Sequence, residues 1–177
     1  MIQIEYLPLV LTGLSITVSI LYYAMVLRNQ NKTRQAQLFM QLYQKYITKE
    51  WWADGWELLQ MEWEDFDDFA QKYDSVVNID NFTKRYVSWY FFDGIGLLLK
   101  KNLVDKEMIY YLMGGYGAIW NWVKFEHIII EGRERLQNPD HLIWFEYLAK
   151  EMLKIRESRG HKLIIPEGWG TYLESNR

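Results

Sequence analysis

Residues 7–27 read LPLVLTGLSITVSILYYAMVL, and the interpretation of the rest of the chain depends on this stretch. It contains no charged residue, and its 21 residues at about 1.5 Å each make a helix of roughly 31 Å, close to the thickness of a bilayer's hydrocarbon core. Pro8 falls in the first turn, where a missing N–H costs nothing. Tyr22 and Tyr23 lie near the far end, where amphipathic rings favour the membrane interface. The stretch therefore predicts a transmembrane helix. Its leucines Leu7, Leu14, Leu21 and Leu27 are expected to lie in the membrane.

The flanks of this span give a direction. Arg28, Lys32 and Arg34 follow it, whereas the residues before it include Glu5 and no Lys or Arg. The positive-inside rule then predicts a single-pass protein of the cell membrane, with Met1 outside and the remaining chain in the cytoplasm. The three basic residues are expected to contact anionic lipid headgroups. A cleaved signal peptide fits less well, because the run is long and has no small residues at a cleavage spacing. A buried core helix is the other alternative.

One face of the predicted span carries hydroxyl groups. Thr12, Ser15, Ser19 and Tyr22 recur at intervals of three and four residues, with Gly13 beside them. Small and hydroxylated residues permit close helix contact in lipid, which predicts a docking face for a second, membrane-embedded chain. The alternative is that these hydroxyls only bond to the backbone of their own helix.

The chain divides further by composition. We expect a transmembrane anchor over residues 1–27, a polar basic stalk over 28–37, a cytoplasmic helical domain over 38–160 and a C-terminal tail over 161–177. No large apolar residue occurs in the stalk, and nothing breaks a helix before Ile47, so span and stalk are predicted to form one helix of about forty residues, roughly 60 Å long. In the tail, Leu163–Pro166 and Trp169 are available to fold back onto the helices.

The domain is predicted to be all-α, because no segment shows sustained alternation of apolar and polar residues. The expected fold is the anchor helix, continuing as a stalk helix into a small bundle of about five further helices. Residues 87–99 (VSWYFFDGIGLLL) contain Asp93 and are too short to cross a bilayer, so they predict a buried core helix. Helix starts are predicted at Thr48, at Asp80 or Asn81, at Asp105 and at Asn138-Pro139, and Gly114, Gly115, Gly117 and Gly160 are predicted to interrupt or end helices.

Asp93 is the first candidate for chemistry. A carboxylate within an apolar helix must be paired or hydrogen-bonded, and Arg85 and Arg133 are possible partners. A structural role is the simpler hypothesis. The alternative is a general base or a ligand-binding carboxylate in a pocket near Asp93 and the Gly114–Gly117 break.

The second candidate is an acidic segment rich in tryptophan. Residues 50–80 carry ten acidic residues and only Lys72 as a basic one, although the whole chain has a net charge of −3. The simplest interpretation is a solvated acidic face with tryptophans in the core. The alternatives are a surface for a basic protein segment, steered by charge and anchored by tryptophan, or a divalent-metal site. The partner surface would comprise Trp52, Trp56, Glu62, Trp63, Asp65, Asp67 and Asp68, and the metal site Glu62, Glu64, Asp65, Asp67 and Asp68.

Several function classes are disfavoured. The absence of cysteine excludes a thiolate nucleophile and Cys-ligated metal sites, and the acidic balance argues against a nucleic-acid partner. There is no phosphate-binding loop, nucleophile elbow or zinc-protease motif, and His127, His141 and His161 show no metal-ligand spacing. We therefore predict no catalytic residue, no metal and no cofactor, and the sequence favours a non-enzymatic role.

Several loose motifs together resemble a family of prokaryotic single-span membrane proteins with a helical cytoplasmic domain of unknown function. They are Leu42-Tyr43, Asp93-Gly94-Ile95-Gly96-Leu97-Leu98, Leu112-Met113-Gly114-Gly115, the series Trp120, Trp122, Phe125, Ile129 and Arg133, and Phe145-Glu146-Tyr147-Leu148. The resemblance covers most of the chain and implies the topology and the helical domain, but no catalytic residues.

The function predicted from these features is protein–protein interaction at a membrane. The chain would bind lipid through its N-terminal helix and another protein chain, as an accessory subunit or a scaffold of a membrane-associated complex. A membrane-tethered hydrolase or a small-ligand sensor is the alternative.

Overall fold

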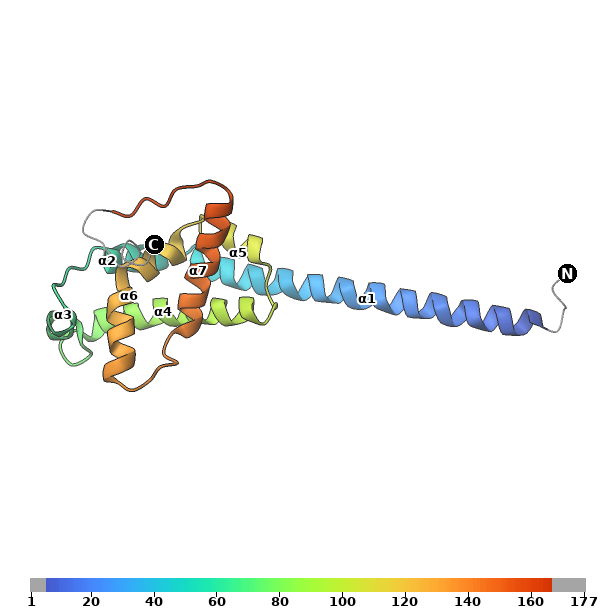
Figure 1. Cartoon of the computed structure of the whole chain (residues 1–177), viewed down its shortest axis with the longest axis horizontal. Coiled ribbons are helices and arrows are strands. Elements are labelled where there is room, and N and C mark those ends of the chain that lie inside the picture. Colours follow the sequence, from blue (N-terminus) through green and yellow to red (C-terminus); the bar gives the residue numbers. More distant parts are fainter. Residues whose placement is uncertain (1–5, 167–177) are drawn as a thin grey trace. The chain divides into compact units, whose positions relative to one another are not determined.

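The computed structural model describes residues 6–166, and over this range the protein is helical, with no β-strand (Figure 1). The all-α prediction and the single forty-residue N-terminal helix are therefore confirmed. Along the chain, the helices are α1 (Leu7–Tyr46), α2 (Lys49–Leu59), α3 (Phe66–Tyr73), α4 (Ile79–Lys100), α5 (Lys106–Leu112), α6 (Gly117–Arg135) and α7 (Ile143–Ser158).

The chain divides into two compact units, Met1–Met40 and Gln41–Arg177. The described part of the first unit consists almost entirely of helix α1. This helix is long and apolar enough to span a membrane, and none of its most apolar window is buried within the described residues. No other helix of residues 6–166 meets the same criteria of length and composition. The alternative that residues 7–27 form a buried core helix is thus not what the structure shows.

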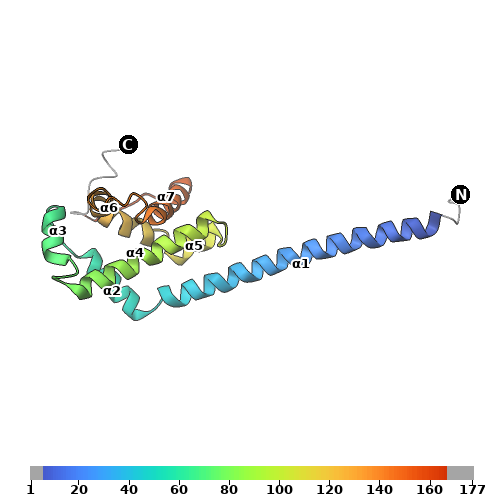
Figure 2. The ribbon, with the colours of Figure 1, turned by 90° about the horizontal axis from the view of Figure 1, so that it is seen from below.

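The core of the second unit lies between α4, α6 and α7. Helix α4 packs most extensively on α7, and α7 packs next on α6, while α2 and α3 contact α4 (Figure 2). The ring of Phe92 on α4 stacks on that of Phe145 on α7 at 5.1 Å between centroids, and Trp122 of α6 meets Phe145 edge-on at 5.3 Å. Residues 87–99 belong to α4 and contribute Trp89, Phe92, Ile95 and Leu99 to this core, which confirms the prediction of a buried core helix.

Helix α7 begins in a way that the sequence did not predict. The expected start at Asn138-Pro139 is wrong, because those residues form a turn and α7 begins at Ile143. Leu142 precedes the helix in the left-handed conformation, with φ of 56°, and offers no side-chain cap. The missing cap comes from α4: Asp93 Oδ1 accepts hydrogen bonds from the backbone N–H of Trp144 at 2.9 Å and of Phe145 at 3.0 Å. A carboxylate on another helix therefore satisfies the first N–H groups of α7.

Gly96 explains why α4 and α7 approach so closely at this point. A Cβ on Gly96 would lie 1.9 Å from the backbone oxygen of Trp144, so only glycine fits. Gly94 has no such neighbour, since a Cβ there would meet nothing within 4 Å. The Asp93-Gly94-Ile95-Gly96 block is thus the junction between two core helices.

Most of the other helix ends follow the sequence. Thr48 accepts from the N–H of Trp51 at 3.2 Å, Asp105 accepts from the N–H of Met108 at 2.9 Å, and Gly160 ends α7 with φ of 70°. The predicted start of α4 at Asp80 or Asn81 is two or three residues late, because the side chain of Asn78 caps the helix.

The tail returns to the helices over its described part. Trp120 Nε1 on α6 donates a hydrogen bond to the backbone oxygen of Ile164 at 3.0 Å. Trp169, which was also expected to fold back, lies outside the described residues.

Candidate binding pocket

The unit Gln41–Arg177 contains a pocket of about 210 Å³. Its walls are supplied by the last residue of α1, by helices α2, α4, α5 and α6, and by the turn between α5 and α6. The lining residues are Tyr46, Trp51, Trp52, Gly55, Trp56, Leu59, Ser88, Phe92, Tyr111, Leu112, Met113, Gly114, Tyr116, Gly117, Trp120 and Asn121.

The turn between α5 and α6 is built by glycines. Gly114 and Gly115 have φ of 61° and 76°, a conformation that only glycine adopts without strain, and they reverse the chain after α5. Gly117 then allows a close approach, since a Cβ there would lie 2.4 Å from the phenol oxygen of Tyr46. The glycine break predicted from the sequence therefore forms one wall of the pocket and seats Tyr46 against it.

Aromatic rings make up most of the remaining wall. Tyr46 contacts Trp51 and Trp52 at 6.0 and 5.7 Å between centroids, and Tyr116 contacts Trp120 at 4.4 Å. Trp52 and Trp56 remain 46% and 48% exposed, so these two indoles lie at the rim of the pocket. Large half-exposed aromatic side chains are typical of recognition surfaces.

Few polar groups reach the pocket, and none of its lining residues is charged. Burial raises the pKa of Tyr46 to about 12, so this phenol stays neutral at physiological pH. Asn121 is buried, and its Nδ2 donates to the backbone oxygen of Gly117 at 2.9 Å. Asn121 Oδ1 is also buried but has no hydrogen-bond partner among the described residues. The lining of the pocket is therefore uncharged and mostly apolar and aromatic.

Asp93 does not line this pocket. It is half-buried and engaged at the N-terminus of α7, as described above. The suggested partners of Asp93 bind elsewhere: Arg85 donates to Asn81 and to the backbone oxygen of Tyr73, and Arg133 pairs with Glu146. The partner of the Asp93 carboxylate is thus helical backbone and neither of the two arginines.

The structure separates the tryptophans of the acidic segment. Trp52 and Trp56 lie at the pocket, whereas Trp63 stacks on Phe125 of α6 at 5.5 Å between centroids. The ammonium group of Lys124 lies 4.7 Å from the ring centroid of Trp63, a cation–π contact. Trp63 is therefore engaged in intramolecular packing, unlike the exposed indoles of Trp52 and Trp56.

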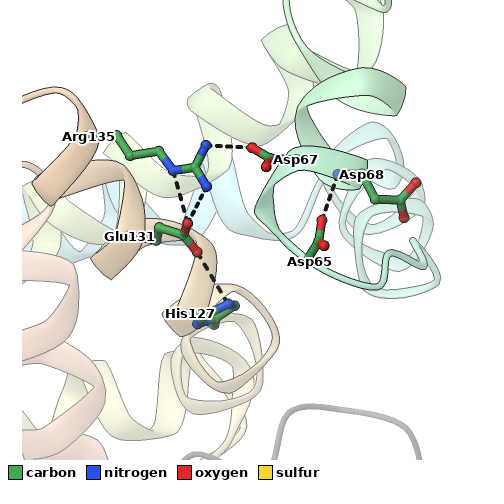
Figure 3. A network of polar contacts seen from close by, with 6 residues as sticks. All are labelled: Asp65, Asp67, Asp68, His127, Glu131 and Arg135. Atoms are coloured by element: carbon green, nitrogen blue, oxygen red, sulfur yellow. Dashed lines mark hydrogen bonds and ion pairs between the residues drawn. The ribbon is translucent and has the colours of Figure 1, made fainter.

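The acidic residues beside Trp63 also bind within the molecule (Figure 3). Asp65 caps α3 by accepting from the N–H of Asp68 at 2.8 Å, and Asp68 in turn pairs with Lys72 at 2.7 Å. Asp67 pairs with Arg135, which also contacts Glu131 on α6. Glu62 is exposed, and its backbone oxygen accepts from the phenol of Tyr73. Among residues 6–166, no three acidic or histidine side chains are placed to hold a metal ion.

In the predicted span, each of three hydroxyl groups bonds to its own helix. Thr12, Ser15 and Ser19 donate to the backbone oxygens of Pro8, Leu11 and Ser15 at 2.8 to 2.9 Å. Tyr22 meets Tyr23 edge-on. This geometry satisfies the hydroxyls without a second helix, and it leaves their outer surface exposed. The residues predicted to contact lipid are exposed as well; they are Leu7, Leu14, Leu21, Leu27, Arg28, Lys32 and Arg34.

No protein-family model, curated protein or solved structure matches the chain. Its function must therefore be argued from its own residues.

The sequence suggested a pocket near Asp93 and the Gly114–Gly117 break; the observed pocket is lined by Gly114 and Gly117 but not by Asp93. Its signals were present separately, as the tryptophans of α2 and the glycines at 114–117, but Tyr46 and Asn121 carry no motif. Only the fold brings these segments together.

Proposed function

We propose that the chain is a single-pass membrane protein that binds a partner protein through its helical domain. In this proposal α1 crosses the cell membrane over residues 7–27, with the N-terminus outside and the helical domain in the cytoplasm. The exposed apolar surface of this helix and the basic residues after it support the anchor and its direction.

The single observation that carries the binding role is the aromatic rim of the pocket. Trp52 and Trp56 leave nearly half of their surface exposed on one short helix, beside a concave apolar wall. Helix α2 also carries Glu50, Asp54 and Glu57, so its surroundings are acidic. Tryptophan anchors supply binding energy, and surrounding charge steers a partner of opposite sign. The proposed partner segment is therefore basic, with apolar residues that contact the two indoles.

The role of the chain depends on the kind of partner. With a soluble partner the chain is a scaffold, and with a membrane complex it is an accessory subunit. The two roles differ in where the partner binds: a scaffold uses the rim of the pocket, whereas a subunit also docks through the Thr12, Ser15 and Ser19 face of the span.

Purification in mild detergent from the native host, with identification of co-purifying chains, tests this proposal. Three variants are compared with the wild type: Trp52→Ala with Trp56→Ala, a span replaced by poly-leucine, and Tyr90→Ala as a control. Tyr90 is 54% exposed on α4 and does not line the pocket. Loss of the partner in the double variant alone supports a scaffold, and loss in the poly-leucine chain supports a subunit. Recovery of the wild-type protein alone and monomeric would overturn the proposal.

A small-ligand sensor is the second candidate function. The observation that favours it is the concave pocket itself, whose lining is aromatic and uncharged. The hydrolase version of this alternative gains no such support, because the carboxylate of Asp93 binds the N-terminus of α7.

A further inference from the structure

We infer that the pocket binds a small, neutral, planar ring compound, a molecule about the size of indole. This inference rests on the second candidate function and does not depend on the partner protein. Three features of the pocket support it: its volume, its aromatic walls and its lack of charge.

The volume sets the size of the ligand. At about 210 Å³ the pocket is smaller than typical sites for drug-sized molecules, which begin near roughly 300 Å³. An engineered apolar cavity of about 150 Å³ accepts benzene. A ligand of one or two fused rings therefore matches the space.

The walls of the pocket determine the shape and polarity of the ligand. Trp51, Trp52, Trp56 and Trp120 contribute indole surfaces, and Tyr46 closes one side against Gly117. Flat aromatic walls pair best with another ring, by offset stacking or edge-to-face contact. An aliphatic ligand of the same volume could not make these stacking and edge-to-face contacts with the walls.

Asn121 does not hold the ligand by a hydrogen bond. Its Nδ2 donates to the backbone oxygen of Gly117 at 2.9 Å, and its Oδ1 is fully buried within the protein. The ring is therefore selected by its shape and by its lack of charge.

The absence of charge in the lining favours a neutral ligand. No lining residue carries a carboxylate or a cation, so a charged ligand would lose its hydration without a compensating ion pair. Aromatic walls can also hold a quaternary ammonium ion, and this is the competing ligand class that the experiment must separate.

The test measures binding of 5-fluoroindole to the full chain in lipid nanodiscs by ¹⁹F NMR. We expect saturable binding of the ring. Tetramethylammonium should not displace it.

Gly55 offers a variant that blocks the pocket without threatening the fold. It lies within α2, lines the pocket, and a Cβ there would meet nothing within 4 Å. Gly55→Leu should abolish binding while the helix remains stable, because leucine is the better helix former. Gly94→Ala is the matched control, because Gly94 is also an exposed-side helical glycine with open space but lies outside the pocket, and it should bind as the wild type does.

Three outcomes would overturn the inference: no saturable binding to the wild type, equal binding to the wild type and Gly55→Leu, or displacement by tetramethylammonium. None of them bears on the partner protein, whose binding is measured separately by co-purification.

Discussion

Asp93 Oδ1 on α4 lies 2.9 Å from the backbone nitrogen of Trp144 on α7, and the same oxygen accepts from the next residue, Phe145. A carboxylate that the sequence marks as a candidate for chemistry thus caps a helix some fifty positions further along the chain. One turn away, Gly96 lets the carbonyl of Trp144 come close to α4. These two contacts stabilise the packing of α4 on α7, the central helix pair of the domain.

The cap predicts a loss of stability when Asp93 is shortened. Asp93→Ala should lower the free energy of unfolding by about 1–2 kcal/mol, because two N–H groups of α7 lose their acceptor. Asp93→Asn should lose less, since the amide oxygen can still accept. Urea denaturation of the full chain in detergent micelles, followed by tryptophan fluorescence, measures both values. An Asp93→Ala protein as stable as the wild type would refute the cap, and loss of a cellular phenotype in that folded variant would favour a ligand-binding role.

Two glycines on α4 should respond in opposite directions to the same substitution. Gly96→Ala should lower the free energy of unfolding by about 2–3 kcal/mol, because the added Cβ would overlap the Trp144 carbonyl and force the helices apart. Gly94→Ala should raise it by up to about 1 kcal/mol through better helix propensity, since open space surrounds that position. Urea denaturation followed by tryptophan fluorescence measures the unfolding free energy of both variants. Equal effects at the two sites would show that the close helix contact is not required.

These contacts show which parts of the fold a sequence can predict. Thr48, Asp105 and Gly160 act on their own helix ends, so local patterns identify them. The start of α7 was predicted at Asn138 because its true cap, Asp93, lies on another helix. For the same reason Trp63 offered no sign that it stacks on Phe125, which is remote in sequence. The pocket forms where three separate segments of the chain pack together, and their packing cannot be predicted from a single sequence.

Arg85 should contribute strongly to stability through its contacts with neutral groups. Its guanidinium is buried, lies 4.4 Å from the ring centroid of Phe69, and donates to Asn81 and to the backbone oxygen of Tyr73. Burial lowers the pKa of Arg85 to about 10, so the group is still charged at neutral pH. Arg85→Ala should cost about 3 kcal/mol, since it leaves both acceptors unpaired and opens a cavity.

Arg135 provides the control for that substitution. Its contacts with Asp67 and Glu131 lie at the surface (Figure 3), where ion pairs contribute at most about 1 kcal/mol and weaken in salt. Arg135→Gln should therefore change the unfolding free energy by less than about 1 kcal/mol, and the change should shrink at high salt. If Arg85→Ala proved no more destabilising than Arg135→Gln, the account of Arg85 would be wrong.

Glu126 on α6 predicts a pH dependence. Burial raises the pKa of this half-buried carboxyl above its usual value, so the folded state favours the neutral form. The neutral form of Glu126 therefore stabilises the folded protein relative to the ionised form. This stabilisation is fully present below the pKa that Glu126 has in the unfolded chain, and it is lost as the pH rises through the higher pKa that Glu126 has in the folded protein. Glu126→Gln should thus be more stable than the wild type at pH 7, and this advantage should fade as the pH is lowered toward 4. Thermal unfolding at several pH values measures it, and a Gln variant that is less stable at pH 7 would contradict the prediction.

The central claim is that α1 anchors the helical domain to the cytoplasmic side of a membrane. The most direct measurement is protease accessibility of a tag fused to the C-terminus, in intact spheroplasts with and without detergent. With this topology, the tag should sediment with the membranes and be digested only after detergent is added. Digestion of the tag in intact spheroplasts, or recovery of the tagged protein in the soluble fraction, would contradict it.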